Sequence, residues 1–93
     1  MENLFRYLEF DKQLIMKSMT CQQLGGACDK VFQAETFEEI AELSKKHGTE
    51  MFQIKDEAHL VAMNKMRELM KSPDAMKEWF DNKRKEFDAL PSD

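Results

Sequence analysis

The 93-residue chain has little of what defines several protein classes. It has only two cysteines, which excludes a disulfide-rich scaffold and makes free thiols the default state in a reducing compartment. Its 14 Lys and Arg are outnumbered by 18 Asp and Glu, and this acidic balance argues against binding to nucleic-acid phosphates. No apolar run approaches the roughly 20 residues that cross a bilayer. We therefore expect a soluble protein with neither a nucleic-acid nor a membrane partner.

The first fifteen residues also lack the uninterrupted apolar core of a signal peptide, because Arg6, Glu9 and Asp11 interrupt it. We therefore expect a cytoplasmic protein. The apolar spacing of residues 1–15 favours a short helix over a strand. Met16 is a second credible start, so we interpret residues 1–15 as an N-terminal extension.

A β-hairpin is predicted where the glycines gather. Residues 16–21 and 29–34 are short segments with β-favouring side chains. Between them, Gly25 and Gly26 permit the positive backbone angles that a chain reversal needs. The prediction is an antiparallel hairpin with a six-residue loop, bounded by Cys21 and Cys28.

A helix is predicted to begin at Thr36, which with Glu39 forms a capping box. Positive charge in the segment before Gly48 suits a helix C-terminus, and glycine is the usual left-handed residue after a helix. We therefore predict that this helix ends at Gly48 and that residues 49–54 form an extended connector rather than a third strand.

Two more helices complete the predicted fold. Asp56 is a candidate N-cap for a helix to about residue 71, and Ser72 with Pro73 ends that helix and starts the next, which runs to about residue 89. The short link makes them a helical hairpin.

The predicted fold class is α+β, mostly helical overall. A small two-stranded antiparallel hairpin packs on a helix and is followed by a C-terminal helical hairpin. We expect one domain over residues 1–93: the extension 1–15, the hairpin and helix 16–55, and the helical hairpin 56–90.

Two cysteines and two histidines, Cys21, Cys28, His47 and His59, are the ligand inventory of a tetrahedral zinc site. Their spacing is unusual, since six residues separate the cysteines and eleven separate the histidines, against about two to four and three to five in common zinc fingers. Two other interpretations remain open: small buried thiols with surface histidines, and a redox pair. The redox pair is disfavoured because no cation adjoins Cys21, and Asp29 follows Cys28.

The sequence shows no nucleophile with a legible base and stabiliser, so we do not expect an enzyme. It is rich in methionine, with five of eight between Met51 and Met76. At helical spacing these residues are typical of a core, or of an adaptable surface for a homodimer or a protein partner. The residues of this candidate surface are Met63, Met66, Met70, Met76, Trp79 and Phe80.

The segment from Met16 to Gly48 resembles a known family. Cys21, Leu24-Gly25, Cys28, the run Glu35-Thr36-Phe37-Glu38-Glu39 and His47 are similar to short bacterial and archaeal proteins catalogued as domain of unknown function 1059 and as predicted small metal-binding proteins. The resemblance implies that Cys21, Cys28 and His47 are ligands. The family often carries a further histidine where this chain has Phe52, so His59 would be a substitute ligand. The function predicted on both grounds is a small cytoplasmic protein with a structural zinc-like ion; the alternative is a helical interaction module without metal.

Overall fold

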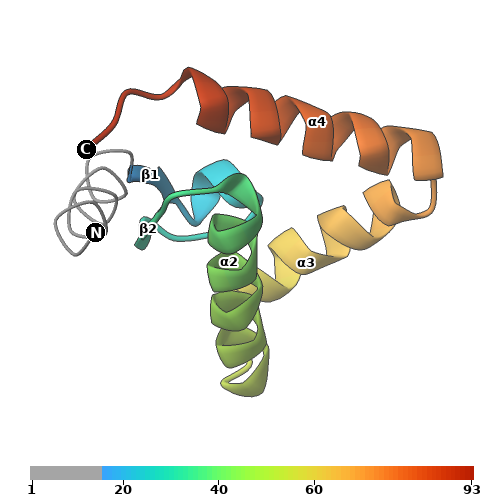
Figure 1. The fold of residues 1–93 in the computed structure, drawn as a ribbon. Coiled ribbons are helices and arrows are strands. Elements are labelled where there is room, and N and C mark those ends of the chain that lie inside the picture. The colour runs from blue at the N-terminus through green and yellow to red at the C-terminus, as the bar shows by residue number, and fades with distance from the viewer. Residues whose placement is uncertain (1–15) are drawn as a thin grey trace, which may run out of the picture.

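The computed structural model describes residues 16–93, so the helix predicted for residues 1–15 lies outside the described residues. Helices make up 65% and strands 10% of the described chain, which confirms the predicted mostly helical α+β fold. The order of elements is strand β1 (Lys17–Thr20), the single 3-10 turn η1 (Gln22–Leu24), strand β2 (Val31–Ala34), and helices α2 (Phe37–Gln53), α3 (Glu57–Met70) and α4 (Pro73–Ala89) (Figure 1).

The predicted antiparallel hairpin is confirmed, although the connection between its strands, residues 21–30, is longer than the predicted six-residue loop. Strands β1 and β2 pair antiparallel, with Met19 opposite Phe32 and Lys17 opposite Ala34. Alternation places the side chains of Met19, Phe32 and Ala34 on the face that packs against the helices, where each is at most 5% exposed. The chain reverses at Gly25, whose φ of 92° lies in the left-handed region that glycine tolerates.

Helix α2 begins as predicted and ends later than predicted. Its N-cap is Thr36, whose hydroxyl oxygen accepts a hydrogen bond from the Glu39 amide at 3.2 Å. The predictions that the helix ends at Gly48 and that residues 49–54 form an extended connector are wrong, because α2 continues to Gln53. Gly48 lies where α3 passes close to α2: a Cβ at this position would be 3.9 Å from Met63 Cε.

The actual end of α2 is a Schellman motif without glycine. The Asp56 amide donates to the Met51 carbonyl and the Lys55 amide to the Phe52 carbonyl, each at 3.1 Å. Lys55 takes the left-handed position with a φ of 56°. Because lysine is rare in that conformation, no local residue pattern predicted a helix end at this position.

The last two helices begin at the predicted caps. The Asp56 carboxylate accepts from the His59 amide, and the Ser72 hydroxyl from the Ala75 amide. From the short link between them, α3 and α4 diverge, and α4 runs back toward the hairpin (Figure 1).

The core lies between the hairpin, the first half of α2 and the last turns of α4. Met19 and Ile40 are fully buried there, and Phe87 of α4 is 3% exposed. In contrast, the only buried side chain of α3 is His59. The position of α3 therefore depends strongly on what His59 contacts.

Candidate metal centre

The structure brings together all four cysteines and histidines of the chain, although they are distant in sequence. Cys21 directly follows β1 and Cys28 lies three residues before β2, so the hairpin loop places both sulfurs at one end of the sheet. His47 projects from the middle of α2 and His59 from the first turn of α3. One donor atom of each residue lies within 4.8 Å of those of the other three.

Two of the sulfur–nitrogen separations fit a tetrahedral ion. Cys28 Sγ lies 3.3 Å from His47 Nε2, and Cys21 Sγ lies 3.6 Å from His59 Nε2. A zinc ion with ordinary Zn–S and Zn–N bonds holds sulfur and nitrogen about 3.6 Å apart at a tetrahedral angle. The two sulfur–nitrogen pairs are therefore already at the separation that a shared ion requires.

The hairpin loop is shaped around the Cys21 sulfur. The Cys21 carbonyl accepts from the amides of Leu24 at 3.1 Å and Gly26 at 2.8 Å, which folds the loop back over its own start. A Cβ at Gly26 would lie 2.1 Å from Cys21 Sγ, so any side chain there would collide with the sulfur. Gly26 is therefore required for the thiol to occupy its position.

Burial is the main influence on the protonation of Cys21. Burial raises the pKa of its thiol above the ordinary value, while hydrogen bonds from the backbone amides of Cys28 and Ala27 oppose that rise. Donors aimed at a sulfur stabilise a thiolate. Without a cation the thiol keeps its proton, whereas a metal ion would displace the proton and find two amides already in place.

His59 is oriented by Asp56. Asp56 Oδ2 lies 2.6 Å from His59 Nδ1, and because a carboxylate only accepts, Nδ1 carries the hydrogen. Nε2, the other ring nitrogen, then faces Cys21 Sγ at 3.6 Å. The hydrogen bond from His59 holds the pKa of Asp56 below its ordinary value. Such carboxylate–histidine pairs commonly orient metal-binding histidines.

His47 has a different environment. Its ring lies edge-on to Phe32 and His59, at centroid distances of 5.7 and 5.2 Å. Desolvation lowers the pKa of His47, and the electrostatic effects of the neighbouring His59 imidazole and of Lys30 lower it further. Within residues 16–93 its Nδ1 is buried without a hydrogen-bond partner. His47 is therefore a neutral imidazole positioned by packing, and a neutral imidazole is the form that binds a metal.

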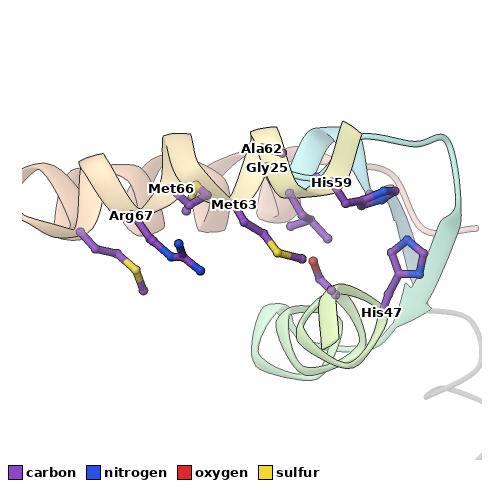
Figure 2. A pocket seen from close by; sticks show the side chains of 13 residues that line it. Gly25, His47, His59, Ala62, Met63, Met66 and Arg67 are labelled. Atoms are coloured by element: carbon purple, nitrogen blue, oxygen red, sulfur yellow. The ribbon is translucent and has the colours of Figure 1, made fainter. Parts of the chain in front are cut away.

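A cavity of about 300 Å³ opens beside this cluster, between α2 and α3. Figure 2 shows His47 and His59 facing each other at one end of it, with Met63, Met66 and Arg67 following along α3. The cluster is thus buried on the hairpin side and borders an open cavity on the other.

Sequence reasoning named all four clustered residues but missed Asp56 as the partner of His59. The three-residue spacing of Asp56 and His59 could have predicted this contact. An N-cap carboxylate lies over the first turn of its helix, and so does a histidine three residues later. Only the cap had been predicted for Asp56.

Comparison with family models, curated proteins and solved structures finds no match for this chain. The predicted resemblance to the small metal-binding family is therefore untested and stays a prediction. The described residues contain no helix long and apolar enough to cross a membrane.

Proposed function

We propose that the protein is a small, non-enzymatic metal-binding protein that holds one structural zinc ion through Cys21, Cys28, His47 and His59. The observation that carries this proposal is the approach of four donor atoms from three separate segments to within 4.8 Å of one another. Two thiolates and two imidazoles are a common donor set of structural zinc sites.

A structural role follows from the number of donors. Catalytic zinc sites keep one position open for water or substrate, whereas four protein ligands close the coordination sphere. The ion would join the hairpin loop, α2 and α3. Since His59 is the only buried side chain of α3, this link would fix α3 more firmly than its remaining packing does.

We include in this proposal two predictions made from the sequence, the cytoplasmic location and the resemblance to small metal-binding proteins. Zinc-binding thiols remain reduced in a reducing compartment, which agrees with a cytoplasmic location. The resemblance to predicted small metal-binding proteins names three of the four donors, and Phe52, at the position of the family's further histidine, is 53% exposed. His59 would supply the donor that Phe52 cannot.

The test is a zinc titration of the reduced, metal-free protein. Binding is monitored by the protons released and by circular dichroism. One equivalent of zinc is expected to release protons from the thiols and to increase order, because the ligands must deprotonate and the bound ion stabilises the folded chain. Cys28→Ser should abolish tight binding. Met63→Leu is the matched control, because it removes a nearby sulfur that is outside the donor set, and it should bind zinc as the unmodified chain does. Zinc uptake without proton release would contradict the proposal.

A second candidate function is self-association through the surface formed by Met63, Met66, Met70, Met76, Trp79 and Phe80. Met70 is 59% and Phe80 38% exposed, and residues of this surface line a groove of about 460 Å³ beside α2. Exposed apolar patches of this kind often mark interfaces. Sedimentation at increasing concentration should show a dimer that Phe80→Ser disrupts and the control Val61→Ser leaves intact. A protein that stays monomeric would contradict this function.

A further inference from the structure

The cavity beside the donor cluster has an apolar wall and one charged residue. Met63, Met66 and Ala62 of α3 line it, together with Gly48 and Ser44 of α2. Thioether side chains are flexible and polarisable, so they adapt to apolar ligands of varied shape. The cavity thus combines adaptable hydrocarbon and sulfur surface with an inner end formed by Cys21, His47 and His59 (Figure 2).

The charge of the cavity is opposite to that of the protein. Among residues 16–93, Arg67 is the only one lining it whose side chain carries a fixed charge, in a chain with a net charge of -4. A zinc ion on two thiolates and two neutral imidazoles adds no net charge, and neither do two thiols. Arg67 therefore gives the cavity a permanent positive charge with or without the ion.

Arg67 is free to meet an anion. Its Nη1 donates to the neutral Asn64 side chain at 3.3 Å, and no ion pair among residues 16–93 includes Arg67. Figure 2 shows its guanidinium directed from α3 into the space beside Met63. A planar guanidinium with unused donors matches the two oxygens of a carboxylate.

We propose that this cavity binds a small organic carboxylate with an apolar body, its carboxylate on Arg67 and its hydrocarbon portion along Met63 and Met66. This site is additional to the ion site and does not depend on it. The groove beside α2 and α4 is less suited to such a ligand, because Glu42 and Lys45 both line it and their charges cancel.

The experiment is calorimetric titration of the zinc-loaded protein with octanoate, and with 1-octanol as the uncharged ligand of equal chain length. Octanoate is expected to bind saturably at one site, and octanol about five- to tenfold more weakly, because it lacks the charge-assisted hydrogen bonds. Arg67→Gln should lower octanoate affinity to that of octanol. Lys65→Gln removes an exposed charge of the same helix outside the cavity and should leave the affinity unchanged.

A second variant tests the apolar portion of the site. Ala62→Leu fills part of the cavity and should weaken octanoate and octanol alike, with circular dichroism confirming the fold. No saturable octanoate binding, equal affinity for octanol, or equal losses in Arg67→Gln and Lys65→Gln would each overturn the inference. A chain that takes up no zinc but still binds octanoate would contradict the proposed zinc site alone.

Discussion

Asp56 accepts a hydrogen bond from His59 Nδ1 at 2.6 Å while its backbone amide completes the Schellman motif that ends α2. One residue therefore ends one helix, caps the next and sets the direction of an imidazole. The cluster depends on this junction, because it determines which ring nitrogen of His59 faces the sulfur of Cys21.

Two substitutions of Asp56 separate its role as the N-cap of α3 from its hydrogen bond with His59. Asp56→Ser keeps an N-capping oxygen but is too short to reach the imidazole, and we expect a 10- to 100-fold loss of zinc affinity, as is typical when the partner of a metal-binding histidine is removed. Asp56→Ala should lose the same affinity and, in addition, about 1 kcal/mol of folding stability from the cap. Competition with a chelator and urea unfolding measure the two effects.

Ser72→Ala is the control for the two Asp56 variants. It removes the N-cap of α4, whose hydroxyl oxygen accepts a hydrogen bond from the Ala75 amide, away from the donor cluster. It should lower stability by about 1 kcal/mol and leave zinc affinity unchanged. Equal zinc affinities for Asp56→Ser and the unmodified protein would show that the contact with His59 does not orient the ring.

Gly26→Ala should disrupt the candidate site. The added Cβ would lie 2.1 Å from Cys21 Sγ, so the loop must shift and move one of the two sulfurs. We expect loss of tight zinc binding and a lower unfolding midpoint in urea. Retention of both would show that the loop rearranges without affecting Cys21.

Gly48→Ala should have the opposite effect on stability. The added Cβ would meet Met63 Cε at an ordinary 3.9 Å, and alanine is the better helix former. The expected gain is about 0.5–1 kcal/mol in free energy of unfolding, measured by urea denaturation. A loss of stability would mean that the passage of α3 over α2 tolerates no added methyl group.

The Glu38–Arg84 ion pair predicts an acid dependence of stability outside the metal site. A hydrogen bond from Arg84 holds the pKa of the Glu38 carboxyl below its ordinary value. The pair therefore stabilises the fold fully above the unfolded-state pKa, and this stabilisation is lost as the pH falls through the lower folded-state pKa. The urea midpoint of Glu38→Gln should approach that of the unmodified protein in acid and lie below it near neutrality.

Glu78→Gln, an exposed change on α4, is the control and should shift the midpoint little at any pH. A Glu38→Gln curve that stays parallel to the unmodified one from neutral to acid pH would contradict the account of this pair.

Local signals explain which elements the sequence could predict. The starts at Thr36, Asp56 and Ser72 were predictable because an N-cap is a contact within one turn of chain. The hairpin followed from the Gly25-Gly26 turn between two β-favouring segments. The end of α2 was mispredicted because Gly48 keeps a helical backbone, and the left-handed residue that ends the helix is Lys55.

The candidate site was predictable in residue types and not in geometry. The counts of cysteine and histidine indicated a donor set, and the loop between Cys21 and Cys28 placed the two sulfurs near each other. The approach of His59 to His47 depends on the reversal at Lys55 and Asp56, which no local pattern revealed. The position of Arg67 at the cavity was hidden for the same reason, because it depends on how α3 lies against α2.

The most direct measurement is X-ray absorption at the zinc edge of the reduced, zinc-loaded protein. We expect two sulfur neighbours at about 2.3 Å and two imidazole nitrogens at about 2.0–2.1 Å from the zinc ion. A first shell of oxygen and nitrogen without sulfur would contradict this expectation.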